Sequence, residues 1–439
     1  MLRYRLSLLL TLFFPSLLSG QLYFPPTSGT TWETATPSAI GWDETRLDSL
    51  RDWLTETNTK AFIVLYRGRI VIEWYLNGHT QDANFQWASA GKTITALAIG
   101  MAQEEGLLNI NDPANQYMGD GWTSATQAQE DAITIWHQLT MTNGLEDNQL
   151  LVDPFCTDKA CLLYRAAAGT RWAYHNAPYT LLDSVIEKAS GESLNAFISN
   201  RIRNPLGMNG LYLKVGFNNV YFSTARSMAR FGLMMQAGGV WNGDTLLHDR
   251  AYFAALTTPS QDINKSYGYL WWLNGQQSYR VPQSQIQFPG PYAPAAPPDL
   301  VAGIGQDGQI LALIPSQELV VVRQGDNPGD GSPAPISYVD SIWRRVNYVQ
   351  LATANETPQA EAKPYRLYPN PSVDVVTLAA DGPSRSLSAE LHTTAGACVE
   401  AWANPGTYSV AHLPRGLYVL TVTEGTRRWA ERLLLAPNR

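Results

Sequence analysis

Two hairpin patterns, far apart in the chain, constrain its fold more than any other feature of the sequence. Residues 60–78, KAFIVLYRGRIVIEWYLNG, contain two runs of β-branched and aromatic residues that meet at Arg67-Gly68-Arg69. Residues 309–325, QILALIPSQELVVVRQG, repeat this arrangement around a turn at residues 315–318. The sequence between the two patterns is mostly helical and loop-like. We therefore expect strands from both ends to form one antiparallel sheet with a helical block inserted between them, which is an α+β architecture.

Four segments have the pattern of helices. Residues 89–105 predict a largely buried helix that ends at Gly106. Residues 179–189 and 224–237 predict further helices in the inserted block. Residues 336–352 predict the helix that closes the domain.

The chain changes character after this helix. Residues 353–364, TANETPQAEAKP, are polar and aperiodic, so they predict a linker. Residues 365–439 alternate short β-like runs with turns, which is the pattern of a small all-β sandwich. We therefore expect one domain over residues 21–352, a linker over 353–364 and a second domain over 365–439.

Residues 1–20 have the layout of a secretory signal peptide. Arg3 and Arg5 precede an apolar run over residues 6–18, and small residues follow it, so cleavage is expected after Gly20. This run is too short to span a bilayer. A buried N-terminal strand is the alternative. No other segment is long and apolar enough to predict a transmembrane helix.

Export would make disulfides possible. Cys156 and Cys161 lie five residues apart in the polar stretch DPFCTDKACLLY, which suits a small loop disulfide, and Cys398 is left over. None of the histidines clusters with these cysteines and no histidine pair has metalloprotease spacing, so no metal site is predicted. A net charge of -7 without a basic stripe argues against a nucleic-acid partner.

The stretch WASAGKTITA, residues 87–96, places a serine and a lysine one helical turn apart. On a helix Ser89 and Lys92 share a face, so the amine can reach the hydroxyl. A serine needs a base to become a nucleophile, and a lysine can be that base when burial lowers its pKa. Lys92 is the only charged residue between Asp82 and Glu104, and a buried unpaired lysine is costly without a role. The alternative is that Ser89 merely caps the helix and Lys92 is solvated.

A second proton-transfer group is expected in the stretch GTRWAYHNAPYTLL. Tyr174 could relay a proton from the serine to the leaving group, because a neighbouring ammonium would favour its deprotonation. Other Y-x-N triplets occur, but only Tyr174 lies between Ser89 and the closing strands. His175 is expected to be a structural or surface residue. Three tryptophans are expected either in the pocket or in the core: Trp87, Trp271 and Trp272.

Together these motifs resemble the serine β-lactamase-related hydrolases. This superfamily includes class C β-lactamases, penicillin-binding proteins, and esterases and amidases of the 6-aminohexanoate-dimer hydrolase type. The resemblance rests on Ser89-Ala-Gly-Lys92, Tyr174-His-Asn176 and AGIGQDGQ from Ala302, and it covers roughly residues 30–350. It implies a β-lactamase/transpeptidase-like fold. Further stretches stand in the family's order, beginning at Gly106, Ile133, Asn204, Ser223 and Tyr267.

The resemblance implies a role for each matched residue. Ser89 would be the acylated nucleophile, Lys92 the base that activates it, and Tyr174 the proton shuttle. No cofactor is implied, because side chains provide the deprotonation.

The substrate side of the site departs from the family's pattern. The resemblance implies that Asn176 binds a substrate amide or carbonyl, and that an N–H near Gly305 and Gln306 completes the oxyanion hole. Where β-lactamases and penicillin-binding proteins have Lys-Thr-Gly or His-Thr-Gly, this chain has Gly303-Ile304-Gly305. A cation that helps to hold a substrate carboxylate is missing there, which favours an esterase or amidase. An arginine elsewhere could replace that cation.

The C-terminal domain resembles type IX secretion sorting domains. The similar stretches stand in order at the end of the chain: YPNPS (from Tyr368), TTAGACV (from Thr393), LPRGLYVLTV (from Leu413) and ERLLLAP (from Glu431). The resemblance implies passage through the outer membrane of a Gram-negative bacterium, with the secretion machinery as partner. It agrees with the signal peptide, because this route begins with export. The alternative is a permanent immunoglobulin-like binding module.

Three functions are therefore compatible with the sequence. The first is a secreted serine hydrolase that cleaves an ester or amide bond of a small-molecule or peptide-like substrate through an acyl-enzyme. The second is a β-lactamase or penicillin-binding D-Ala peptidase, and the third is a non-catalytic binding protein on the same fold. The complete set of Ser89, Lys92 and Tyr174 favours the first.

Overall fold

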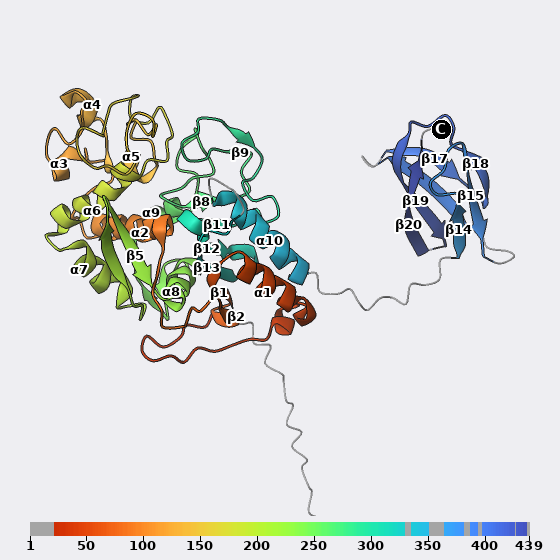
Figure 1. Ribbon diagram of the computed structural model, residues 1–439, viewed down its shortest axis with the longest axis horizontal. Coiled ribbons are helices and arrows are strands. Elements are labelled where there is room, and N and C mark those ends of the chain that lie inside the picture. Colours follow the sequence, from red (N-terminus) through yellow and green to blue (C-terminus); the bar gives the residue numbers. More distant parts are fainter. Residues whose placement is uncertain are drawn as a thin grey trace, which may run out of the picture. The chain divides into compact units, whose positions relative to one another are not determined.

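The computed structural model describes residues 22–329, 335–350, 364–381, 387–393, 397–425 and 427–436 (Figure 1). The chain divides into two compact units, residues 1–352 and 353–439. The predicted signal peptide, and the predicted linker except for Pro364, lie outside the described residues. No helix in the described ranges is long and apolar enough to cross a membrane.

A six-stranded sheet forms the centre of the first unit. Its strands are β1 (Thr59–Tyr66), β2 (Arg69–Tyr75), β8 (Trp272–Leu273), β11 (Val301–Gly305), β12 (Gln309–Ile314) and β13 (Leu319–Gly325). Their order is β2-β1-β13-β12-β11-β8, and every neighbouring pair is antiparallel. Because β1 pairs with β13, the two predicted hairpins join into one sheet. The predicted α+β architecture is confirmed.

Helices cover both faces of this sheet, with α8 (Ala225–Gln236) on one face and α1 (Leu47–Glu56) and α10 (Ile336–Gln350) on the other (Figure 1). The approach of α8 is close: a β-carbon at Gly232 would stand 2.6 Å from side-chain atoms of Leu311 and Val320. On the opposite face Trp53 of α1 stacks on Tyr338 of α10, with 5.5 Å between the ring centroids. As a result β12 and β13 are buried along their whole length.

The inserted block places two helices beside the sheet, α2 (Lys92–Glu104) and α6 (Asn176–Ser190). The prediction that an α-helix begins at Ser89 is corrected: residues 88–91 form a tight 3-10 turn, η3 (Ala88–Gly91), which leads into α2. The helix α6 begins at Asn176 rather than at Tyr179. The other α-helices and strands described in this unit are α3 (Asn115–Met118), α4 (Gln127–Asp131), α5 (Ile135–Leu139), α7 (Leu194–Ile198), α9 (Arg250–Leu256), β3 (Phe85–Gln86), β4 (Leu211–Val215), β5 (Asn218–Ser223), β6 (Val240–Trp241), β7 (Asp244–Thr245), β9 (Ser278–Tyr279) and β10 (Phe288–Pro289).

The second unit is all-β, as the sequence predicts. One sheet contains β14 (Tyr365–Tyr368), β15 (Val375–Ala380) and β18 (Gly406–Ser409). The other contains β16 (Ser388–Thr393), β17 (Cys398–Trp402), β19 (Gly416–Glu424) and β20 (Arg427–Leu435). Apolar side chains of both sheets form one core, including Val376 and Leu378 from the first and Leu391 and Leu420 from the second.

Candidate active site

Ser89 lies in a sharp turn that is anchored by Trp87. The Trp87 ring is fully buried, its indole N–H donates to Ser223 Oγ at 2.8 Å, and its edge meets the Tyr221 ring at 5.2 Å between centroids. Ala88 has a φ of 44°, a left-handed conformation that is uncommon for residues other than glycine. Ser89 is half-buried in the first turn of η3, where a backbone N–H has no partner within the helix.

Lys92 points from the start of α2 to Ser89. Its Nζ donates to Ser89 Oγ and to Asn176 Oδ1, both at 2.8 Å, and the side chain is only 3% exposed. Burial lowers the pKa of Lys92 to about 7, although the negative charge of Asp183 raises it in part. Near neutral pH, Lys92 is therefore able to exist as a free amine and to accept the Ser89 proton.

Tyr174 lies two residues before the start of α6 and is buried against aromatic rings. It stacks on Trp272 with 5.8 Å between centroids, and Lys92 Nζ lies 5.2 Å from the Tyr174 ring centroid. Burial raises the pKa of Tyr174 to about 12, and a hydrogen bond with Ser89 offsets this only in part. The sequence predicts the opposite direction. Desolvation is the larger of these two effects, so Tyr174 keeps its proton in the free site.

Asp183 is a buried carboxylate that the sequence reasoning did not find. It lies on α6, where it accepts hydrogen bonds from Asn219 Nδ2 at 3.0 Å and from Thr95 Oγ1 at 3.4 Å. Burial raises the pKa of Asp183 to about 7, against these hydrogen bonds and the attraction of Lys92. The signal was present in the sequence, since Asp183 interrupts the otherwise uncharged stretch YTLLDSVI.

The edge of the sheet reaches the turn that carries Ser89. A β-carbon at Gly305 would stand 2.4 Å from the Trp87 carbonyl oxygen and 3.0 Å from the Ala90 nitrogen, so only glycine allows this approach. The contact brings the end of β11, and with it Gln306, beside Ser89. The three residues Ser89, Gly305 and Gln306 line the same cavity.

Two cavities, of about 410 and about 350 Å³, share Ser89, Phe155, Asn176 and Gln306 as lining residues. Among the described residues that line either cavity, Lys92 is the only lysine, arginine or histidine. Trp272 lines the first cavity, whereas Trp87 and Trp271 are fully buried in the core. An arginine that could replace the missing cation of the third motif is therefore absent from the described lining.

The structure brings all of the predicted site residues together around these cavities: Ser89, Lys92, Tyr174, Asn176, Gly305 and Gln306. Asn176 uses its Oδ1 for Lys92, which leaves its Nδ2 available to a ligand. Cys156 and Cys161 form a disulfide next to Phe155 in the cavity wall. His175 is fully buried, so the idea that it lies at the surface is wrong, and burial lowers its pKa to about 4.

Comparison with known proteins agrees with this geometry. Residues 54–326 match the family model "Beta-lactamase", and residues 366–436 match "Secretion system C-terminal sorting domain". The 6-aminohexanoate-dimer hydrolase of Paenarthrobacter ureafaciens is 23% identical over 324 residues, which cover 65% of this chain and 76% of that protein. Esterase EstB of Burkholderia gladioli is 28% identical over 149 residues, which cover 29% of this chain and 38% of that protein.

Solved structures share the fold of the first unit. A putative 6-aminohexanoate-dimer hydrolase from Bacillus anthracis aligns with a TM-score of 0.56 at 20% identity, covering 77% of this chain and 91% of that one. A putative β-lactamase from Bacteroides dorei aligns with a TM-score of 0.56 at 17% identity, covering 70% of this chain and 99% of that one.

Proposed function

Because the chain belongs to the Beta-lactamase family, whose members include serine hydrolases, we propose that it cleaves an ester or amide bond through an acyl-enzyme on Ser89. The single observation that carries this proposal is the 2.8 Å hydrogen bond between the buried Lys92 amine and the Ser89 hydroxyl. Ser89 lines both cavities and Lys92 lines the second, and each cavity is large enough for a small substrate.

Acylation would begin with proton transfer from Ser89 Oγ to the neutral amine of Lys92. The oxygen then attacks the substrate carbonyl, and the resulting oxyanion is held by the backbone N–H groups of Ser89 and Gln306. Tyr174, which keeps its proton near neutral pH, would donate that proton to the leaving alcohol or amine and recover one from Lys92. A water molecule then attacks the acyl-enzyme and releases the acid, which returns Ser89 to its starting state.

The lining of the cavities supports a substrate without a carboxylate beside the scissile bond. A negatively charged group there would meet no cation other than Lys92 among the described lining residues, and Lys92 is engaged with Ser89 and Asn176. It would also lie near the carboxylates of Asp153 or Asp307. This favours a neutral ester or amide over a β-lactam or a D-Ala-D-Ala peptide, whose carboxylates need a partner.

Labelling of the mature protein with a fluorophosphonate probe, read by mass spectrometry, tests the proposal. We expect one adduct on Ser89 that is absent from Ser89→Ala. Turnover of nitrocefin, or stable acylation by penicillin, at a rate above that of neutral esters would support the β-lactamase or D-Ala peptidase instead. A folded protein without any adduct would leave the non-catalytic binding protein as the better description.

The second part of the proposal concerns the location of the protein. The sorting-domain match over residues 366–436 indicates type IX secretion, so the protein is secreted or at the cell surface. We propose that residues 1–20 are removed as a signal peptide and that the producing cell is a Gram-negative bacterium. Intact-mass measurement of the extracellular protein tests this, since a chain that still begins at Met1 would contradict it.

A further inference from the structure

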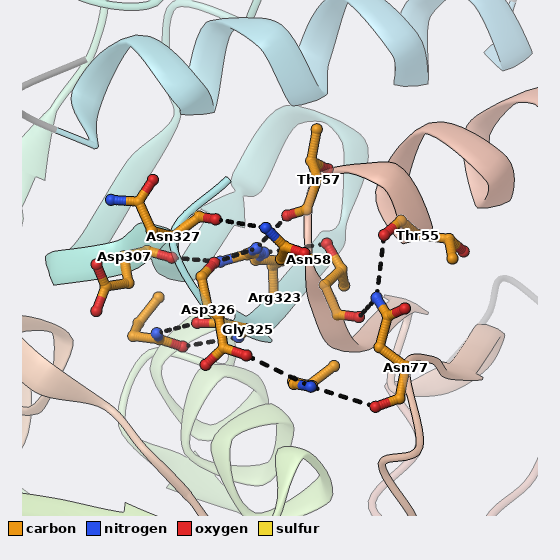
Figure 2. Close-up of polar contacts among 12 residues, drawn as sticks. Thr55, Thr57, Asn58, Asn77, Asp307, Arg323, Gly325, Asp326 and Asn327 are labelled. Carbon is orange, nitrogen blue, oxygen red and sulfur yellow. Dashed lines mark hydrogen bonds and ion pairs between the residues drawn. The ribbon is translucent and has the colours of Figure 1, made fainter. Parts of the chain in front are cut away.

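Arg323 is a fully buried cation behind the candidate oxyanion site. It lies near the end of β13, on the sheet face that carries α10, and its guanidinium carbon is 5.0 Å from the Tyr338 ring centroid. Figure 2 shows oxygens from three separate segments converging on its guanidinium group. These are the start of β1, the end of β13 and the turn between β11 and β12.

Every hydrogen bond that the structure describes for Arg323 goes to an uncharged oxygen. Nε donates to Thr59 Oγ1 at 3.1 Å, and Nη2 donates to the carbonyls of Thr57 at 2.8 Å and Asp326 at 2.9 Å. Nη1 donates to the carbonyls of Asp307 and Gly308. Among the described residues no carboxylate forms an ion pair with Arg323. A buried arginine held in this way is expensive to desolvate, and its five donors in a rigid plane cannot be reproduced by a lysine.

Two of those carbonyls belong to the turn that follows Gly305. Residues 306–308 connect β11 to β12, and Asp307 is held there with a left-handed φ of 60°. A β-carbon at Gly308 would stand 2.9 Å from Arg323 Nη1, so the guanidinium group packs directly against the backbone of the turn. Gln306 in this turn lines both cavities beside Ser89, and Asp307 and Gly308 line the first of them.

A second contact fixes where the turn ends. The Gln309 side chain donates to the Gly325 carbonyl at 2.6 Å and accepts from the Gly325 N–H at 3.1 Å. Gly305 is held at the other end by its close packing on Trp87 and Ala90. Between these two fixed ends, the peptides of Asp307 and Gly308 are held by Arg323.

We propose that Arg323 is a positioning residue for acyl transfer, which fixes the turn at residues 306–308 and so aims the Gln306 N–H at the oxyanion. The inference rests on the proposed function, because it requires that Ser89 forms a tetrahedral intermediate. An oxyanion donor is effective only when its position is set before the reaction, and loss of one donor costs about 100-fold or more in rate. Displacement of the turn removes that donor but leaves the walls formed by other segments, such as Phe155 and Trp272, in place.

The test compares Arg323→Lys with a matched control, Arg230→Lys. Arg230 is also buried and also donates to backbone carbonyls, those of Leu206 at 3.0 Å and Pro26 at 2.8 Å, but neither Leu206 nor Pro26 lines a cavity. For each protein, the rate constant of Ser89 phosphonylation and the kcat and KM for a neutral ester are measured per titrated active site. Counting active sites separates a loss of rate from a loss of folded protein.

We expect Arg323→Lys to lower kcat and the phosphonylation rate constant together, by about tenfold or more, while KM changes by less than about threefold. Arg230→Lys should keep the wild-type rates per active site. Wild-type rates in Arg323→Lys, or an equal loss in both variants, would overturn the positioning role. Absence of any Ser89 adduct in the wild-type protein would instead overturn the proposed function, and this inference with it.

A milder variant covers the case in which Arg323→Lys does not fold. Thr59→Val removes the acceptor of Arg323 Nε but keeps the shape of the side chain. We expect kcat to fall by about threefold with KM unchanged, because one of the guanidinium's hydrogen bonds is lost. A kcat equal to that of the wild type would count against the positioning role.

Discussion

Gly303 of β11 lies so close to Thr93 of α2 that a β-carbon at Gly303 would stand 2.9 Å from Thr93 Cγ2. The same β-carbon would stand 3.3 Å from the Ala90 carbonyl oxygen. At this position the β-lactamases and penicillin-binding proteins that the chain resembles have a lysine or histidine. The packing of β11 against α2 therefore leaves little room for any larger side chain at position 303.

Gly303→Ala should lower the free energy of unfolding by about 1–3 kcal/mol, because the added methyl group overpacks this contact. Thr93→Ser removes Cγ2 but keeps the hydroxyl that donates to the Ala90 carbonyl at 2.7 Å. In the Thr93→Ser background the cost of Gly303→Ala should therefore fall towards zero. Urea denaturation of the four proteins of this double-mutant cycle measures the coupling. An equal cost in both backgrounds would place the clash at the Ala90 carbonyl instead.

The rate of acylation should rise with pH through about 7. Burial lowers the pKa of Lys92 to about 7, so the lysine loses its proton as the pH increases through that value and becomes a base. An unperturbed lysine would not do so until about pH 10.4. The pH dependence of kcat/KM for a neutral ester measures the midpoint. A profile that is flat between about pH 5 and about pH 9, or that rises only near the ordinary value, would contradict the role of Lys92 as base.

Asp183→Asn should move the midpoint of this pH profile to lower pH. The carboxylate of Asp183 raises the pKa of Lys92, so its removal makes the lysine ammonium easier to deprotonate. The amide can still accept a hydrogen bond from Thr95 or Asn219, which keeps the packing. Asp52→Asn, which changes an exposed carboxylate of α1, is the control and should leave the midpoint in place. A midpoint that rises in Asp183→Asn would show that the carboxylate does not act on Lys92 through charge.

Sequence patterns were sufficient for the features that depend on neighbours along the chain. The alternating β-branched runs predicted both hairpins, and the isolated charge of Lys92 in an apolar helix predicted a buried amine next to Ser89. Features that depend on distant segments were missed. Arg323 and Thr59 are 264 residues apart, and nothing in either segment indicates the contact.

The chemistry of Tyr174 was misjudged for the same reason. A lysine nearby suggested a lowered tyrosine pKa, whereas the rings of Trp172, Tyr267 and Trp272 bury the phenol and raise its pKa. Trp172 is a neighbour along the chain, but Tyr267 and Trp272 come from a distant segment that the sequence does not connect to Tyr174. The tight turn at Ser89 was missed because it depends on the approach of Gly305, which no local pattern reports.

Loss of the disulfide between Cys156 and Cys161 should weaken substrate binding more than it slows the chemistry. The bridge closes a short loop, so by the loop-entropy relation its removal lowers the stability of the folded loop by about 2 kcal/mol. Phe155, next to the bridge, lines both cavities, whereas Ser89 and Lys92 are held by other elements. The double variant Cys156→Ser, Cys161→Ser should therefore raise KM severalfold with kcat nearly unchanged.

Steady-state kinetics with and without dithiothreitol measure this effect. Reduction should change the wild-type protein in the same direction as the double variant, and should not change the double variant further. Cys398→Ser is the control, because Cys398 is the free cysteine of the other unit and should leave both constants unchanged. A fall in kcat at constant KM would contradict this prediction. It would mean that the loop with Phe155 supports the positions of Ser89 and Lys92 rather than the binding of the substrate.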